Sequence, residues 1–303
     1  MNDIVTDVKS LELETLKNLK SSKATNTLRA YKADYKDFAH FCIKHGFKSM
    51  PTEPKILSLY LTHLSQTSKF STLKRRLASI SVIHRLSGHY IDTKHPMITE
   101  NLMGIKRVKG SYQKAKKPIL INDLKSIVNV IDKDQNEKRR AKNRALILVG
   151  FAGGFRRSEL VAINTEDIDF VTEGVKIFIK RSKTDQSGEG MTKGIPYFSN
   201  PNYCPVISLK SWLEKSEIKS GKIFDMSDRS VALIIKKYTA IAGLDSNKYS
   251  GHSLRSGFAT SAAELGAEER SIMAMTGHKT TQMVRRYIQE ANLFKNNALN
   301  KIK

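Results

Sequence analysis

The sequence has little cysteine and no long apolar run. Its two cysteines, Cys42 and Cys204, lie far apart, and neither belongs to a CxxC pair or a Cys/His cluster. This spacing indicates neither a disulfide framework nor a structural zinc site, and it fits a reducing cytoplasm. No eighteen apolar residues run together, and the first twenty residues lack the apolar core of a signal peptide. We therefore expect a cytoplasmic protein that does not associate with membranes.

Acidic residues are also scarce relative to basic ones. The chain has 52 Lys and Arg against 29 Asp and Glu, which gives a formal charge of +23 and a pI near 9.9. Residues 1–117 hold 22 basic and 9 acidic residues, and residues 118–303 hold 30 and 20. Such an excess suits a polyanion and makes nucleic acid the first candidate partner of both halves. Lysines that only maintain solubility would give the same composition, so the motifs must decide.

The length and one basic segment predict two domains. A chain of 303 residues is longer than most single cores. The segment KRVKGSYQKAKK, residues 106–117, carries six basic residues and almost nothing apolar, which predicts an extended, mobile connection. We therefore expect an N-terminal extension over 1–22, a first domain over 23–108, a basic linker over 109–117 and a second domain over 118–303. A basic linker between two basic domains suits a protein that closes around a duplex.

The apolar spacing predicts a mainly helical chain. Between residues 25 and 45, Leu28, Tyr31, Tyr35, Phe38 and Cys42 recur every three or four residues, the period of an amphipathic helix. Further helices are expected over 53–66, 70–88 and 93–110, then over 118–132 and 137–154. Short β-rich runs over 167–198 predict a small antiparallel sheet, and the rest from residue 205 is again mostly helical. The fold class is thus an all-helical domain followed by an α+β domain.

Basic side chains on the polar faces of these helices and in the linker are the candidates for contact with double-stranded DNA. A solvated helix face is the ordinary explanation for any one of them. The candidates are Arg29, Lys32, Lys74, Arg75, Arg76, Lys106, Arg107, Lys109, Lys114, Lys116 and Lys117.

Four short segments carry the chemistry: GGFRRSEL at 153–160, RSKTDQ at 181–186, GHSLRSG at 251–257 and TGHKTTQMVRRYI at 276–288. In order and spacing they resemble the tyrosine recombinase, or phage integrase, family, with Tyr287 nine residues after His278 as in that family's Gly-His and tyrosine motifs. HxxR alone is common by chance, but four matches in the right order are specific. The first half also resembles the family's helical, SAM-like core-binding domain, so the resemblance covers nearly the whole chain. The residues on the family's catalytic positions are Arg156, Glu159, Lys183, His252, Arg255, His278 and Tyr287.

The resemblance implies a metal-independent reaction through a covalent 3′-phosphotyrosine. Attack on a phosphodiester builds negative charge, which fixed cationic donors must meet where no metal does. The planar guanidinium groups of Arg156 and Arg255 can each pair with two phosphate oxygens. Arg157 is a neighbouring alternative to Arg156, but the family pattern places the catalytic arginine one step before x-S-E-L. No cofactor is expected.

The remaining positions take their roles from the same resemblance. An ordinary phenol has a pKa of about 10, so Tyr287 needs help to lose its proton, from His252, nearby arginines or both. Lys183, on the hairpin, would protonate the departing 5′-oxygen. His278 would donate a hydrogen bond to the phosphate. Glu159 would orient His252 or the arginines.

Other functions are open at this stage. A type IB topoisomerase shares this chemistry, and a non-catalytic DNA-binding regulator shares the charge and the helices. Transposases and nucleases that use two metals need spaced carboxylates, and none is found. The compact length and GHSLRSG favour recombination of the Cre or Xer kind on two inverted half-sites.

The end of the chain predicts a homotetramer on DNA. Apolar residues recur there at roughly helical spacing: Ile288, Leu293, Phe294, Ala298, Leu299 and Ile302. A helix with an apolar stripe must bury it somewhere. In the family that this chain resembles, the last helix packs into the neighbouring protomer, and folding back on its own domain is the alternative.

Overall fold

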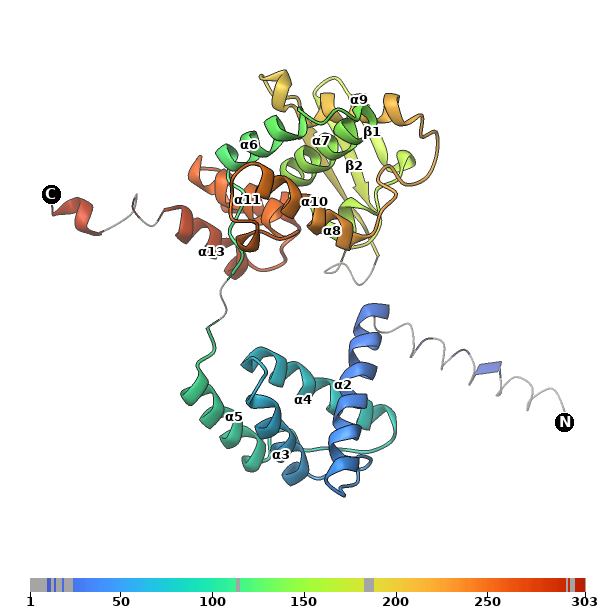
Figure 1. The fold of residues 1–303 in the computed structure, drawn as a ribbon, viewed down its shortest axis with the longest axis vertical. Helices are drawn as coiled ribbons and strands as arrows, with labels where there is room; N and C mark the ends of the chain where they lie inside the picture. The colour runs from blue at the N-terminus through green and yellow to red at the C-terminus, as the bar shows by residue number, and fades with distance from the viewer. Residues whose placement is uncertain are drawn as a thin grey trace. The chain divides into compact units, whose positions relative to one another are not determined.

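The computed structural model describes residues 10–11, 14, 18, 24–112, 115–182, 188–292, 294 and 298–302. The chain divides into two compact units, residues 1–114 and residues 115–303 (Figure 1). This division falls inside the segment that the sequence assigns to the linker. We call them the N-terminal unit and the C-terminal unit and describe each by itself.

The N-terminal unit is helical over its described part. Its helices are α2 (Thr25–Lys44), α3 (Pro54–Ser65), α4 (Phe70–Leu86) and α5 (Pro96–Lys109). Their apolar faces share one core, in which Phe38, Tyr60 and Leu73 are fully buried. Helix α5 continues to Lys109 and ends at Gly110 with φ +72°, as the helix expected over 93–110 predicts. The extended segment expected from residue 106 is therefore wrong for its first four residues.

The C-terminal unit is built around α7 (Glu137–Ala152). Every residue from Ala145 to Ala152 is buried, because α6, α9 and α11 pack around this helix (Figure 1). The second half of α7 is apolar on all sides, which suits such a central place. The other helices are α6 (Ile121–Ile131), α8 (Arg157–Leu160), α9 (Pro205–Ser216), α10 (Asp228–Ile241), α11 (Ser253–Glu264), α12 (Glu269–Thr276) and α13 (Thr281–Ala291), with 3-10 turns η1 (Thr165–Asp167), η2 (Pro201–Tyr203) and η3 (Ser246–Lys248).

A three-stranded antiparallel sheet lies at one side of this unit. Its order is β1 (Ile168–Val171), β2 (Gly174–Ile179) and β3 (Met191–Pro196), with Phe170 opposite Val175 and Val175 opposite Ile195. Alternate residues of β2 face the core, as a half-buried strand requires. On β3 the inward positions are Lys193 and Ile195. The predicted fold class, mainly helical with a small antiparallel sheet, is confirmed.

The end of the chain differs from the single helix that its apolar spacing predicts. Helix α13 ends at Ala291, and Ala298–Lys301 form only a 3-10 turn, η4. Phe294, Leu299 and Ile302 are 81%, 62% and 78% exposed. Leu293 lies outside the described residues. Within the described ranges, no helix is long and apolar enough to cross a membrane.

Candidate active site

A tight turn at the end of α7 leads into the first residue of the candidate site. Gly154 has φ +54°, in the left-handed region that favours glycine, and a side chain on Gly153 would collide with the ring of Phe155. The turn leaves two consecutive carbonyls facing inward. The carbonyl of Gly153 accepts from Lys193 Nζ at 2.8 Å, and that of Gly154 accepts from Arg255 Nη1 at 2.9 Å. Two buried side chains, Lys193 and Arg255, therefore fix the backbone that leads into Arg156.

Arg156 lies just before α8 and is held by Glu159. The Glu159 carboxylate accepts from the Arg156 backbone N–H at 2.9 Å and from its Nη1 at 2.5 Å. Glu159 is 4% exposed, so this charged pair is largely shielded from water. Of the two orienting roles that the sequence suggests for Glu159, these bonds support the one toward the arginine. Arg157 diverges: its side chain packs over Gly251, and its Nη2 lies 3.7 Å from the carboxylate of Asp228.

Arg255, the third residue of α11, is only 1% exposed. Its Nη2 donates to Nε2 of His278 at 3.1 Å, in addition to the bond from Nη1 to Gly154. Burial, and then the charge of Arg156, lower the pKa of Arg255 to about 10, so it remains protonated at neutral pH. Its buried Nε–H has no hydrogen-bond partner among the described residues. A buried N–H donor without a partner is costly, and an anionic ligand would satisfy it.

His252 and Tyr287 lie next to each other. His252 directly precedes α11 and Tyr287 lies on α13, and the His252 Nε2 is 3.3 Å from the Tyr287 Oη. Burial and the charges of Arg255, Arg156 and Arg157 lower the pKa of His252. A neutral imidazole can accept a proton from the phenol.

His278 lies between Thr276 and Arg255, near the ring of Tyr287. Its Nδ1 is 2.8 Å from Thr276 Oγ1, and its ring centre is 6.2 Å from that of Tyr287. Burial, followed by the charges of Arg255 and Arg156, lowers the pKa of His278 to about 4. The imidazole is therefore neutral at physiological pH.

Lys183 lies outside the described residues, but the sheet supplies a lysine that the sequence reasoning missed. Lys193 is 1% exposed, and its Nζ lies 4.4 Å from the centre of the Phe155 ring. Burial, then the charges of Arg255 and Arg156, lower the pKa of Lys193 to about 7, against the opposing effect of Glu159. The available signal was its register, since Lys193 shares the inward face of its strand with Ile195.

These side chains form a cationic cluster beside a phenol. Two guanidinium groups converge with two neutral imidazoles, and each guanidinium is fixed by a carboxylate or a backbone carbonyl. Preorganised donors of this kind stabilise charge that develops on phosphate oxygens. The described ranges contain no group of three or more His, Cys, Asp or Glu side chains that could hold a metal ion.

Comparison with known proteins decides the family. Residues 119–293 match the model of the phage integrase family, a span that holds every catalytic candidate. The chain belongs to the phage integrase family. A relative of 41% identity, the integrase/recombinase XerD homologue of Selenomonas ruminantium, aligns over 96% of this chain and 89% of its own. The tyrosine recombinase XerC of Staphylococcus aureus is 25% identical over 92% and 91%. The predicted resemblance to tyrosine recombinases is confirmed.

Solved structures show the same integrase fold. The XerH site-specific recombinase bound to palindromic difH substrate superposes with a TM-score of 0.62 at 18% identity, covering 82% of this chain and 73% of that one. A lambda integrase (75–356) dimer bound to a COC′ core site gives 0.58 at 18% identity, covering 91% and 93%. At this level of identity the likeness concerns the fold.

Most candidate DNA contacts of this integrase are exposed. Arg76 is the exception: it is half-buried and bonds to Asp37 and to the hydroxyl of Tyr60. Arg75, although exposed, pairs with Asp34. Lys114 lies outside the described residues. The exposed candidates are Arg29, Lys32, Lys74, Arg75, Lys106, Arg107, Lys109, Lys116 and Lys117.

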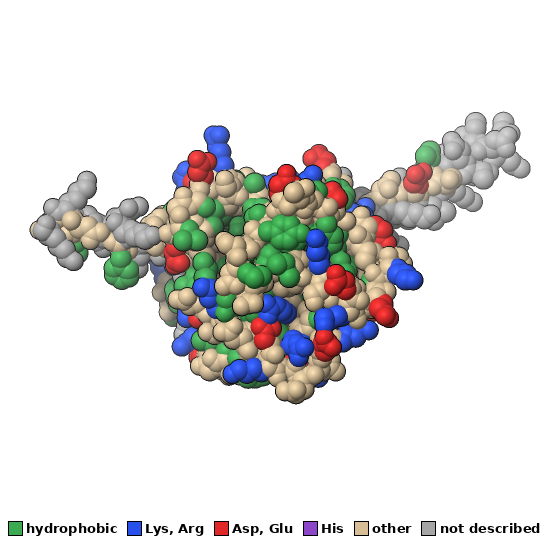
Figure 2. Space-filling model, turned by 90° about the horizontal axis from the view of Figure 1, so that it is seen from above, with side chains coloured by type: hydrophobic (Ala, Val, Ile, Leu, Met, Phe, Trp, Pro, Cys, Tyr) green, Lys and Arg blue, Asp and Glu red, His purple; other side chains and the backbone are tan. Residues whose placement is uncertain are grey.

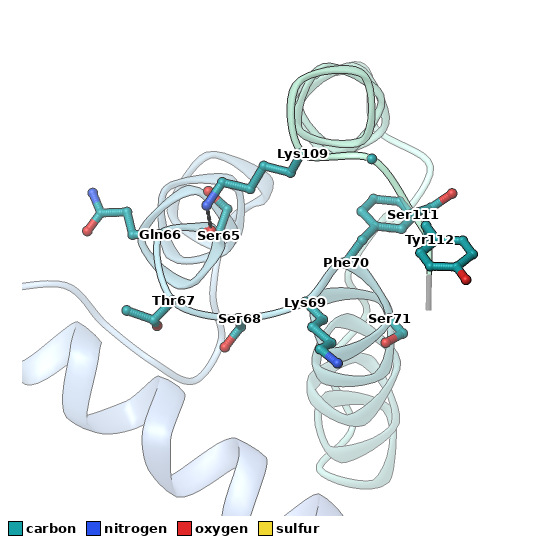
Figure 3. Close-up of a pocket in the computed structure, with 11 residues that line it drawn as sticks. Ser65, Gln66, Thr67, Ser68, Lys69, Phe70, Ser71, Lys109, Ser111 and Tyr112 are labelled. Carbon is teal, nitrogen blue, oxygen red and sulfur yellow. Dashed lines mark hydrogen bonds between the residues drawn. The ribbon is translucent and has the colours of Figure 1, made fainter. Parts of the chain in front are cut away.

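Three of the candidates at the linker are tied to the body of a unit. Lys109 Nζ donates to the carbonyl of Ser65, the last residue of α3, across a hollow of about 300 Å³ (Figure 3). Lys116 donates to the carbonyl of Asn247, and Lys117 lies 3.5 Å from the carboxylate of Asp123. The face of the C-terminal unit seen in Figure 2 mixes acidic, basic and hydrophobic side chains, so no single-sign surface stands out there.

Proposed function

We propose that this chain cuts and rejoins DNA at specific sites through a covalent bond to Tyr287. The observation that carries the proposal is the Tyr287 hydroxyl 3.3 Å from His252 Nε2, beside the buried Arg255. In the first step the phenol oxygen attacks the scissile phosphorus while His252 takes the phenol proton. The bond from phosphorus to the 5′-oxygen breaks, and a 3′-phosphotyrosine forms.

The two arginines would stabilise the negative charge that develops on the phosphate in this step. Arg156, held by Glu159, and Arg255, with its buried Nε–H, would bind the non-bridging oxygens, which suits phosphoryl transfer driven by positioning and electrostatics. Lys183 is our proposed donor of a proton to the departing 5′-oxygen. Rejoining is the reverse: a 5′-hydroxyl attacks the phosphotyrosine, and Tyr287 leaves and regains its proton. Neither a metal nor another cofactor enters this scheme.

The DNA partner follows from the charge and the family. We propose that both units bind a duplex with two inverted half-sites, using the exposed basic candidates, and that the reaction occurs in the cytoplasm. The hollow beside Lys109 belongs to this interface, because hydroxyls and amines line it and phosphate oxygens accept from such groups. Contacts to phosphate would hold the protein in place, and contacts to bases would select the site.

We also propose a homotetramer joined through the C-terminus. The C-terminal unit has an apolar groove of about 670 Å³, lined in part by Phe151, Phe258 and Leu265. The exposed Phe294 and Leu299 at the end of the chain offer an apolar segment that suits such a groove in a neighbouring copy. A head-to-tail contact of this kind closes into a ring when the geometry permits, and four half-sites on two DNA sites would impose that geometry.

The decisive experiment is covalent capture of a nicked suicide substrate in excess EDTA. The wild type should form a protein–DNA adduct, and Tyr287→Phe should bind the same DNA without forming one. An adduct of normal yield with Tyr287→Phe would place the nucleophile elsewhere, and a requirement for magnesium would overturn the metal-free scheme. Joining between two different DNA molecules separates a recombinase from a topoisomerase, which relaxes supercoils within one. A regulator without catalysis would form no adduct.

A further inference from the structure

A chain of hydrogen bonds runs from α12 to Arg255 through His278. The hydroxyl oxygen of Thr276 lies 2.6 Å from the carbonyl oxygen of Ile272 and 2.8 Å from Nδ1 of His278. On the other side of the imidazole, Nε2 lies 3.1 Å from Nη2 of Arg255. Thr276 is fully buried, so water does not compete for its hydroxyl.

The positions of the protons in this chain follow from the donors and acceptors. Two oxygens 2.6 Å apart must share a proton, and a carbonyl has none, so the single hydroxyl proton of Thr276 points to Ile272. Thr276 Oγ1 can then only accept from His278, which requires a proton on Nδ1. At the other end, an arginine Nη donates and never accepts, so Nε2 of His278 must be without a proton. Two independent contacts thus require the same form of the ring.

We propose that Thr276 is a positioning residue that holds His278 as the Nδ1–H tautomer, so that Nε2 accepts from Arg255 and orients its guanidinium. This rests on the proposed function to the extent that Arg255 binds the scissile phosphate. The sequence implied that His278 donates to the phosphate. In this tautomer the proton of His278 points to Thr276, and the ring acts on the phosphate through Arg255.

The consequence for Arg255 is a guanidinium fixed at two points. Nη1 is held by the carbonyl of Gly154 and Nη2 by His278, which leaves the buried Nε–H free of any partner among the described residues. A guanidinium held at both Nη atoms cannot rotate about its terminal bonds. It would therefore present its remaining N–H groups to the phosphate in one orientation, with less entropy lost on binding.

The test begins with the unaltered protein. In the full chain labelled with ¹⁵N-histidine, long-range proton–nitrogen correlations distinguish a protonated from an unprotonated ring nitrogen, and the signals of His278 are assigned by their loss in His278→Asn. We expect Nδ1 protonated and Nε2 unprotonated at pH 7. A wild-type ring protonated at Nε2 would overturn the proposal, whatever the activity of the protein.

Two variants of Thr276 then test whether it positions His278. Thr276→Val keeps the shape but removes the oxygen, so His278 should lose its single tautomer and cleavage of bound suicide substrate should slow about three- to tenfold, the usual effect of one hydrogen bond. DNA affinity should be unchanged. Thr276→Ser keeps the oxygen and should keep the wild-type spectrum and rate.

Three outcomes decide between a positioning and a structural role. Wild-type ¹⁵N signals and rate in Thr276→Val would refute the positioning role. If that variant does not fold, the proposal is decided by Thr276→Ser and the wild type, since a changed tautomer in Thr276→Ser would contradict it. A wild-type protein that shows the Nδ1–H tautomer but forms no adduct with DNA would reject the proposed function and leave the tautomer assignment intact.

Discussion

The Nε2 of His252 lies 3.3 Å from the Oη of Tyr287, although the two residues belong to different elements and are separated by 35 positions in the sequence. His252 is fixed at the start of α11, in the same turn as Arg255, while Tyr287 is carried by α13. The proposed base and the proposed phosphate-binding arginine are therefore placed by one helix, and the proposed nucleophile by another.

His252→Gln should slow covalent capture by a factor of about 10²–10⁴, the usual contribution of a general base. Burial and three arginines lower the pKa of His252, so its neutral form persists to a lower pH than in an ordinary histidine. The wild-type rate should therefore hold as the pH falls through about 6.5 and decline only below that. The variant should lack this acidic decline. Single-turnover rates measured from pH 5 to 8 on prebound substrate check both points, and an unchanged rate in His252→Gln would assign the base elsewhere.

The lowered pKa of Lys193 predicts how the free energy of unfolding changes with pH. Its pKa is about 7 in the folded protein, and an unfolded lysine has a pKa of about 10.4. Between these values the unfolded chain binds more protons, so this group makes stability rise with pH from about 7 toward 10. Below pH 7 both states are protonated and the cost of burying the charge is fully present. Lys193→Met removes the titrating group.

The measurement is urea unfolding of the two proteins at several values between pH 6 and 9.5. The wild type should gain stability relative to Lys193→Met above pH 7, and the difference should be constant below it. Because all other groups are shared, their titration cancels in the comparison. A difference that is independent of pH throughout this range would show that Lys193 keeps an ordinary pKa.

Much of this architecture could be predicted from sequence periodicity. The helices of the N-terminal unit begin and end within a few residues of the predicted bounds, because a clear apolar stripe faces one core. Over Lys106–Lys109 two predictions overlapped, a helix that runs to residue 110 and an extended segment that begins at residue 106. Sequence could not choose between them, because a run of charge is typical of both an exposed helix and extended backbone. A charged segment can remain helical when its neighbours anchor it, as Ile98 does from its fully buried position in α5.

The sequence predicted candidate residues for the site but not their contacts. The motifs gave Arg156, Arg255 and Tyr287, because their spacing follows from the fold of the family. Thr276 stands in one of the motifs and Lys193 in the predicted sheet, but the sequence assigned neither a role, since their bonds to carbonyls arise only in the folded backbone. Which partner Glu159 holds likewise depends on the short turn before α8.

Removal of exposed positive charge should weaken DNA binding in a salt-dependent way. Alanine at Lys74, Lys106 and Arg107 should lower the slope of log affinity against log salt by roughly 0.9 for each phosphate that the protein no longer neutralises. Preference for the target site over other DNA should be unchanged, because phosphate contacts carry no sequence information. Three exposed lysines outside the predicted set, Lys133, Lys138 and Lys219, provide the matched control. Equal slopes in the two triple variants would remove these candidates from the interface.

Deletion of residues 292–303 should separate binding from assembly. Helix α13 ends at Ala291, so the truncation keeps the element that carries Tyr287. Binding to a single half-site should remain within about twofold, and cooperative filling of two half-sites should be lost together with strand exchange. Gel-shift titration on one and two half-sites, with Phe294→Ala as a milder variant, measures this. Normal recombination by the truncated protein would exclude the C-terminal contact.

Helix α13 is held by a small apolar cluster of its own. Val284 is fully buried against Ala259, Ala263 and Ile272, and this group is separate from the large core around α7. Displacing α13 therefore disrupts a few side chains and leaves the turn that fixes Arg156 and Arg255 in place. In the proposed tetramer the energetic cost of withdrawing Tyr287 would be local, and an idle subunit would keep its two arginines assembled while its proposed nucleophile is out of reach. Control of timing in such a tetramer would need no refolding, only the docking and release of one helix.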